Sequence, residues 1–272
     1  MSNIIEKFGY MYELHKRNLK NYFIHTKSSI NEPLTPNSIH WVGHATVLIN
    51  IGGKIIVTDP VTSMSLGHLK RLVSPSKDLS KIKLDYILLS HGHIDHMNYN
   101  TLRKLNKDAI VICPKNYKGS LHFLGFKKVI PLSPGRNYSD EFISIDAFKA
   151  NHDGRRYYIG KESQSSAYLI SGKEKSVFFA GDTAFTDNFN GIKADVAIMP
   201  VGCYKPDDFL SMHCSPEQSF KMFKMTNAKF MIPIHYKTFI LSQDNDIATI
   251  KSLNKINDGT IKLINIGQTI KL

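Results

Sequence analysis

Three histidines and one aspartate fall within six residues, at His91, His93, Asp95 and His96, directly after the largely apolar run Leu84–Leu89. A run of this kind is typical of a strand covered on both faces of a sheet. In extended backbone, side chains two positions apart project to the same side, which brings His91 and His93 together. Imidazole and carboxylate ligands at this density suit a borderline cation such as Zn²⁺. The segment therefore predicts a metal site at the end of a buried strand.

Other strand-like runs lie on both sides of the midpoint of the chain, mixed with helical segments, and this predicts a layered α/β domain. The runs lie at Ala45–Ile51, Lys54–Thr58, Ala109–Cys113, Phe142–Phe148, Ala167–Ile170, Val177–Ala180, Val196–Pro200 and Phe230–Ile234. A glycine pair between the first two runs permits the tight turn of a hairpin. One helix is expected over about Tyr99–Leu105. Another is expected to begin at Pro216, because Ser215 and Gln218 form a capping-box pattern there.

The composition is that of an ordinary globular protein, since 42% of the 272 residues are hydrophobic and 21% are charged. Residues Met1–Lys20 hold no apolar core of signal-peptide type, and no stretch reaches the length of a membrane span. Three scattered cysteines favour neither a disulfide framework nor a CxxC metal site. We therefore expect a soluble, cytoplasmic protein.

Lysine and arginine outnumber aspartate and glutamate by 35 to 23, which gives a formal net charge of +12. This charge favours anionic partners, or it serves solubility alone. No stretch shows the dense basic and aromatic clustering of a nucleic-acid site, so nucleic acid is not the expected partner.

The apolar residues of Ile4–Tyr22 recur at helical spacing. We expect residues 1–34 to be a helical extension that packs on a main domain of residues 35–272, with peripheral membrane contact as the alternative.

The order His-x-His-x-Asp-His after a strand resembles the signature of the metallo-β-lactamase fold hydrolases. The resemblance implies an αββα sandwich, in which two mixed sheets lie face to face between outer helices. It also implies three later ligands, and His152, Asp182 and His235 follow later strand-like runs in order. By resemblance, His91, His93 and His152 hold one divalent ion, Asp95, His96 and His235 hold the other, and Asp182 bridges the two.

Two divalent ions that share one water lower its pKa towards neutrality and so supply a metal-bound hydroxide as the nucleophile. They also stabilise negative charge that develops on the bond under attack. Asp95 is expected to orient the hydroxide, and the expected reaction is hydrolysis rather than redox chemistry. Zinc is the expected metal, with manganese as the alternative.

Further runs resemble the branch that includes the phospholipase D acting on N-acyl-phosphatidylethanolamines and the ascorbate-6-phosphate lactonases. They are Trp41–Ile49, Val57–Pro60, Arg71–Pro75, Pro200–Tyr204 and Ile234–Phe239. The resemblance implies a small-molecule or phospholipid substrate with a phosphodiester bond, or a phosphorylated sugar lactone. A nuclease and a non-catalytic metal-binding protein remain open. Gly92 and Asn98 stand where close phospholipase relatives would have a larger residue and an aspartate.

Several residues outside the seven ligands are candidates for the site. His213 matches a histidine near the active site of that branch, and we expect it to donate a proton or contact the substrate. His44 is a candidate for a role at or near the metals. Five loop residues are candidate phosphate contacts or plain surface residues, namely Arg155, Arg156, Tyr204, Lys205 and Lys237.

Overall fold

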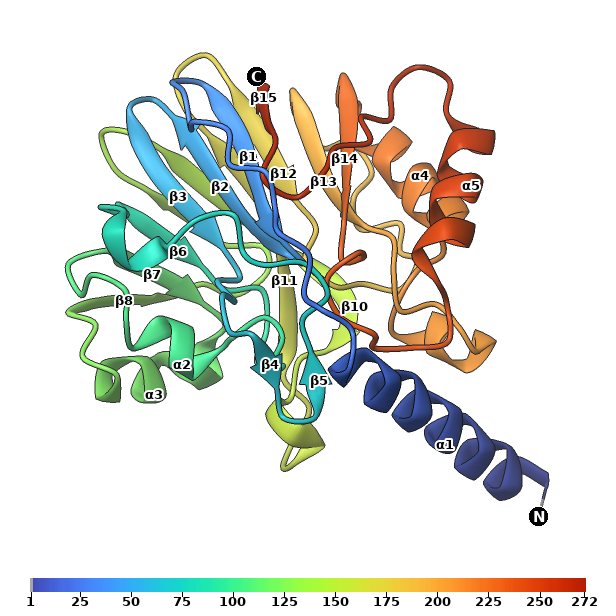
Figure 1. Ribbon diagram of the computed structural model, residues 1–272. Helices are drawn as coiled ribbons and strands as arrows, with labels where there is room; N and C mark the ends of the chain where they lie inside the picture. The colour runs from blue at the N-terminus through green and yellow to red at the C-terminus, as the bar shows by residue number, and fades with distance from the viewer. Residues whose placement is uncertain (1) are drawn as a thin grey trace.

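Two β-sheets lie face to face, with helices on the outer side of each, in the computed structural model (Figure 1). The structure describes the backbone of residues 2–272 and the side chains of residues 9–272. The main apolar core, which includes Trp41, Phe178 and Ile198, lies between the sheets, and all three side chains are fully buried. The predicted αββα sandwich is therefore confirmed.

The first sheet has the strand order β15-β1-β2-β3-β6-β7-β8. The bounds are β15 (Thr269–Lys271), β1 (Ser38–Gly43), β2 (Thr46–Ile51), β3 (Lys54–Thr58), β6 (Tyr86–Leu88), β7 (Ile110–Cys113) and β8 (Lys128–Pro131). Strands β15 to β3 pair antiparallel, whereas β3, β6, β7 and β8 pair parallel. The short helices η1 (Leu79–Lys81), α2 (Tyr99–Leu102), η2 (Lys115–Tyr117) and α3 (Lys118–Phe123) lie in its connections, and a small ribbon is formed by β4 (Ser65–Leu66) and β5 (Leu69–Lys70).

The second sheet has the strand order β14-β13-β12-β11-β10-β9. The bounds are β14 (Phe230–Ile234), β13 (Val196–Pro200), β12 (Ser176–Phe179), β11 (Gln164–Ser171), β10 (Ser144–Asp153) and β9 (Asn137–Ser139). Strands β9 to β12 pair antiparallel, and β12 to β14 pair parallel. Helices α4 (Pro216–Met225) and α5 (Asp246–Ile256) cover its outer face, and η3 (Arg156–Tyr158) and η4 (Asp207–Ser211) lie in its loops.

The predicted elements are found close to their expected bounds. The hairpin of β2 and β3 turns at Gly52 and Gly53, whose φ angles of 58° and 72° suit residues without a Cβ atom. The Ser215 cap of α4 forms both hydrogen bonds of a capping box. The end of β10 was misjudged, because the strand continues through His152 instead of ending at Phe148. Its pairing with β11 shifts register after Lys149, and this irregular stretch leads into the site.

The amino-terminal helix α1 (Ser2–Tyr22) projects from the sandwich in Figure 1, and its hydrogen bonds to the rest of the chain come from its second half. Arg17 donates to the carbonyl oxygens of Ser242 and Asp244, at 2.6 and 3.0 Å. The amide of Asn18 donates to Ile240 O. The side chains of Ile4, Ile5 and Phe8, on which the helical pattern partly rests, lie outside the described side chains. Within residues 2–272, no helix has both the length and the apolarity to cross a bilayer.

Candidate metal centre

All seven predicted ligands gather at one edge of the sandwich, where strands of both sheets end. The first sheet supplies His91, His93, Asp95 and His96 from the loop after β6, and the second sheet supplies His152 from β10, Asp182 from the loop after β12 and His235 from the residue after β14. Parallel strands end at the same edge of a sheet, so the topology delivers these residues to one place. Each of them is buried or half-buried.

His91, His93 and His152 form the first group, in which one ring nitrogen of each lies within 4.8 Å of the others. His93 Nδ1 and His152 Nε2 are 3.2 Å apart. The other nitrogen of His152, Nδ1, donates to Met212 O at 2.6 Å. Because a carbonyl oxygen can only accept, this bond places the proton on Nδ1 and leaves Nε2 free to bind a cation.

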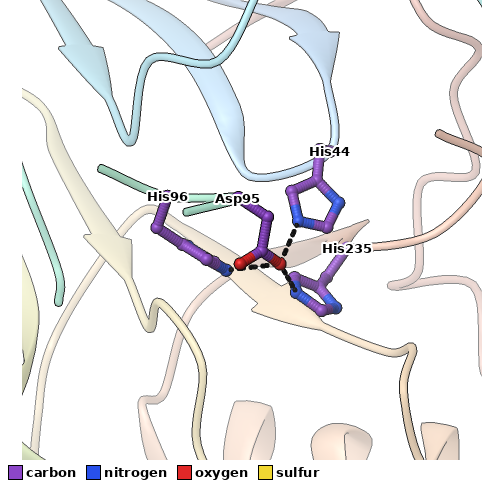
Figure 2. A group of neighbouring side chains, drawn as sticks. All are labelled: His44, Asp95, His96 and His235. Carbon is purple, nitrogen blue, oxygen red and sulfur yellow. Dashed lines mark hydrogen bonds and ion pairs between the residues drawn. The ribbon is translucent and has the colours of Figure 1, made fainter. Parts of the chain in front are cut away.

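Asp95 lies at the centre of the second group (Figure 2). Its Oδ2 atom is 3.6 Å from His96 Nε2 and 3.7 Å from His235 Nε2. His44 approaches the same oxygen from β1's end, with Nε2 at 3.0 Å. The rings of His44, His96 and His235 therefore surround Asp95 Oδ2. His44, which lies between β1 and β2, thus belongs to the site.

Asp182 lies beside the second group. Its Oδ2 atom is 3.1 Å from His96 Nε2 and 3.1 Å from His235 Nε2. The rings of His91 and His96, one from each group, have centroids 4.2 Å apart. Asp182 thus contacts the second group, and that group adjoins the first through His91 and His96.

The electrostatics of this pocket favour positive charge between the carboxylates. Burial alone would raise the pKa of Asp182, but the His235 and His96 rings hold that pKa well below its usual range. For His235, burial opposes protonation, yet the Asp182 carboxylate raises the pKa of the ring to about 9. A cation is therefore favoured next to Asp182, whether a proton on a ring or a metal ion.

Asp59 is a functional residue that the sequence interpretation did not assign. Its Oδ2 atom accepts hydrogen bonds from His96 Nδ1 at 2.7 Å and from Ser90 Oγ at 2.6 Å. Since Ser90 Oγ donates to Asp59, it accepts from His91 Nδ1, which lies 2.9 Å away. One buried carboxylate thus fixes a ring from each group with Nε2 turned inward. Asp59 directly follows the strand-like run Lys54–Thr58, and this position at a strand end is the sequence signal that could have found it. The parallel pairing of β3 with β6 then brings it to the ligand loop.

The donor set fits divalent metal ions. Buried polar atoms normally have hydrogen-bond partners, and unpaired ones require an explanation. Among the described residues, Nε2 of His91, His93, His96 and His235 is buried without a hydrogen bond, as is Oδ1 of Asp182. The His96 and His235 nitrogens lie near Asp182, but not in hydrogen-bond geometry. Imidazole nitrogens and carboxylate oxygens in this arrangement are ligands that zinc and similar ions accept.

His213 lies at the site, whereas the candidate phosphate contacts have other partners. His213 Nδ1 is 3.7 Å from Asp182 Oδ2. Arg155 Nε donates to Asp153 at 2.7 Å, and Arg156 Nη1 donates to Gly92 O and Met97 O at 3.0 and 2.8 Å. The remaining three are engaged elsewhere: Tyr204 with Thr249, Lys205 with Asp207, and Lys237 with Ile264 O and the ring of Tyr236.

Fold and site together define a metallohydrolase of the two-sheet sandwich type, and comparison with known proteins agrees. The Beta-lactamase superfamily domain matches residues 54–236. A UPF0173 metal-dependent hydrolase of Bacillus cereus (strain AH187) is 30% identical over 248 residues, covering 86% of this chain and 99% of the relative.

Two solved structures share the fold at low sequence identity. The metallo hydrolase Igni18 from the archaeon Ignicoccus hospitalis has a TM-score of 0.65 and 20% identity, over 86% of this chain and 97% of its own. An isothiocyanate hydrolase from Delia radicum gut bacteria has a TM-score of 0.70 and 16% identity, over 86% of this chain and 98% of its own. The chain belongs to the metallo-β-lactamase superfamily and, within it, to the UPF0173 group of metal-dependent hydrolases. The prediction of a metal-dependent hydrolase is confirmed, and the finer branch stays a prediction.

Proposed function

We propose that this protein hydrolyses a phosphodiester with the help of two divalent metal ions, most simply zinc. His91, His93 and His152 would hold one ion, Asp95, His96 and His235 the other, and Asp182 would contact both. The observation that carries the proposal is the position of Asp182, whose buried carboxylate lies 3.1 Å from a ring nitrogen of His96 and of His235. When bound, such a pair of ions activates a shared water and offsets charge that develops on the substrate.

Asp95 is proposed to orient the attacking water, and His44 to hold Asp95. Burial lowers the pKa of the His44 ring to about 3, so the ring is neutral at pH 7. Despite burial, the neighbouring His96, His235 and His44 rings keep the pKa of Asp95 well below its usual range. An ionised carboxylate can only accept, so Nε2 of His44 carries the proton and donates to Asp95 Oδ2.

His213 and Tyr158 are proposed to contact the substrate. Burial lowers the pKa of His213 to about 3, which makes it a neutral hydrogen-bond donor rather than a source of a full proton at pH 7. Burial raises the pKa of Tyr158 to about 12, so its hydroxyl keeps its proton. Both residues line the same cavity beside the site, and the Tyr158 ring lies 5.0 Å from that of His93. Two neutral donors there suit an anionic or polar oxygen.

The choice of a phosphodiester is supported by sequence and by charge. The runs Trp41–Ile49 and Val57–Pro60 resemble the phospholipase D and lactonase branch, and the chain carries a formal charge of +12. The two candidate arginines, Arg155 and Arg156, hold protein groups instead of an anion. Neutralising a phosphate would therefore fall to the metals, and this limits the substrate to a group of low charge such as a diester.

The test measures metal content together with hydrolysis of bis(p-nitrophenyl) phosphate, on protein purified without chelator. Wild type is expected to hold two metals per chain and to be active, and Asp182→Ala is expected to abolish activity. Asp108→Ala is a matched control, because that carboxylate is exposed and pairs with Lys127 away from the site. Two metals without activity would overturn the phosphodiester and favour a lactone. No metal after addition of zinc or manganese would overturn the site itself.

A further inference from the structure

A cavity of about 1130 Å³ opens beside the metal centre, between the amino-terminal helix α1 and the helix η4. Its walls include Tyr10 and Met11 from α1 and Phe209 and Met212 from the η4 segment. Its inner end is formed by His213, whose Nδ1 lies 3.7 Å from Asp182 Oδ2, and the exposed Tyr158 lines the same cavity. The volume lies slightly above the range of about 300–1,000 Å³ for small-molecule sites, and it exceeds what the reacting group alone would fill.

The walls of this cavity are built from side chains that recognise apolar groups. The rings of Tyr10 and Phe209 meet edge to face with centroids 5.3 Å apart, which joins the two walls. Met11 is 56% exposed although it is a large apolar side chain. Methionine and aromatic side chains adapt to irregular apolar ligands. These residues lie next to the site without taking part in the ligand set.

The polar groups at the two ends of the cavity differ, and this difference determines the orientation of a bound ligand. His213, at the inner end, is a hydrogen-bond donor beside the metal ligands, and Tyr158 lines the cavity with its ring 5.0 Å from that of His93. Asp208 lies at the exposed side, where it disfavours a second anionic group, whereas the neighbouring Asp207 is paired with Lys205. A ligand with one anionic end and one apolar end therefore fits in a single orientation, with the anionic end at the metals.

We infer that this cavity binds a long apolar substituent of the substrate, and that α1 is the element that sets this specificity. The inference rests on the proposed function for the place of the reacting bond. The substrate class is then an amphiphile, in which an alkyl or similar apolar group is attached to the hydrolysed phosphodiester. The anchoring of α1 by Arg17 and Asn18 holds Tyr10 and Met11 in the cavity wall.

The test compares octyl phosphate with methyl phosphate as ligands of the zinc-loaded full chain, by isothermal titration calorimetry. Wild type is expected to bind octyl phosphate about tenfold more tightly or better, since burial of about two methylene groups supplies that factor. Met11→Ser and Phe209→Ser are each expected to reduce the ratio of the two affinities to about threefold or less. Phe123→Ser is the control, because Phe123 is 90% exposed on α3, far from α1 (Figure 1), and its ratio should equal that of wild type.

The outcomes separate this inference from the proposed function. Equal affinities for the two phosphates, or a ratio that both cavity variants leave unchanged, would overturn the cavity assignment while hydrolysis of bis(p-nitrophenyl) phosphate could still stand. A chain-length preference that depends on Met11, in a protein that does not hydrolyse the diester, would support the cavity and overturn the reaction. Met11 is a half-exposed helix residue, so Met11→Ser is expected to fold. If Phe209→Ser failed to fold, Met11→Ser alone would still decide the test.

Discussion

His96 Nδ1 and Asp59 Oδ2 form a hydrogen bond of 2.7 Å between two side chains that are both fully buried. The same carboxylate reaches His91 through the hydroxyl of Ser90. His91 and His96 belong to different groups of the centre, so one residue directly after β3 orients a ligand for each proposed metal. Partners of this kind fix the tautomer and the direction of a metal-binding ring.

Asp59→Asn is therefore expected to weaken binding of both metals, by about 10- to 100-fold. Ser90→Ala removes only the link to His91, so its effect should fall on one of the two metals. Competition with a chromogenic chelator, read as two separate affinities, measures both variants. An Asp59→Asn protein with two unchanged affinities would show that this network does not orient the ligands.

His44 offers a different prediction, because it touches Asp95 without belonging to the proposed ligand set. Removal of its hydrogen bond by His44→Ala should lower kcat by about 10-fold or more while two metals stay bound. Metal analysis and steady-state kinetics on the same preparation separate the two effects. His40→Gln is a suitable control, since His40 bonds to Ser76 and Thr269 away from the centre. If His44→Ala loses a metal, His44 is a ligand rather than a positioning residue.

Gly92 has a structural reason to be glycine. A Cβ atom there would lie 2.0 Å from the hydroxyl oxygen of Tyr117, which donates to Gly154 O at 2.6 Å. Gly92→Ala should therefore destabilise the fold by about 1–3 kcal/mol. Tyr117→Ala opens the space, so the double variant should lose less stability than the two single losses added together. Urea unfolding of all four proteins tests this, and strict additivity would contradict the contact.

The buried ring of His40 predicts a pH dependence of stability. Burial lowers its pKa from 6.5 to about 4, so the folded state binds the proton more weakly than the unfolded state. Its contribution is complete above pH 6.5 and is lost as pH falls towards 4. With allowance for solvent screening, the loss between pH 7 and pH 5 is about 1 kcal/mol.

Urea unfolding at both pH values, in excess chelator, measures this loss. His40→Gln keeps a side chain that can hydrogen-bond but does not titrate, so its stability should fall less between the two pH values. The difference between the two proteins isolates His40 from the other histidines. An equal fall in wild type and His40→Gln would contradict the prediction.

The strands of the sheets and the ligand cluster could be predicted from the sequence because they depend on local patterns. The glycine turn between β2 and β3, the cap at Ser215 and the apolar run before His91 each act over a few residues. The predicted end of a strand at Phe148 was wrong because it rested on a local pattern alone. Continuation of β10 to Asp153 depends on pairing with Gln164 of β11, a contact that no local pattern encodes.

The surroundings of the ligands depend on contacts that are distant along the chain. Asp59 reaches His96 across 37 positions, and only the parallel pairing of β3 with β6 makes them neighbours. Arg156 is a candidate phosphate contact by sequence, but in the structure it donates to Gly92 O and Met97 O and holds the ligand loop. The residues next to a basic side chain in a loop do not indicate which oxygen atom will accept its hydrogen bonds.

The ligands come from both sheets, and this has a consequence for how the protein is made. The loop after β6 supplies four of the seven, and His235, the last, follows β14 near the far end of the chain. A nascent chain has no complete site until the ribosome has passed residue 235 and the second sheet has closed on the first. Loading of the proposed metal pair would then come after synthesis of nearly the whole domain, and an amino-terminal fragment would hold at most part of the proposed ligand set.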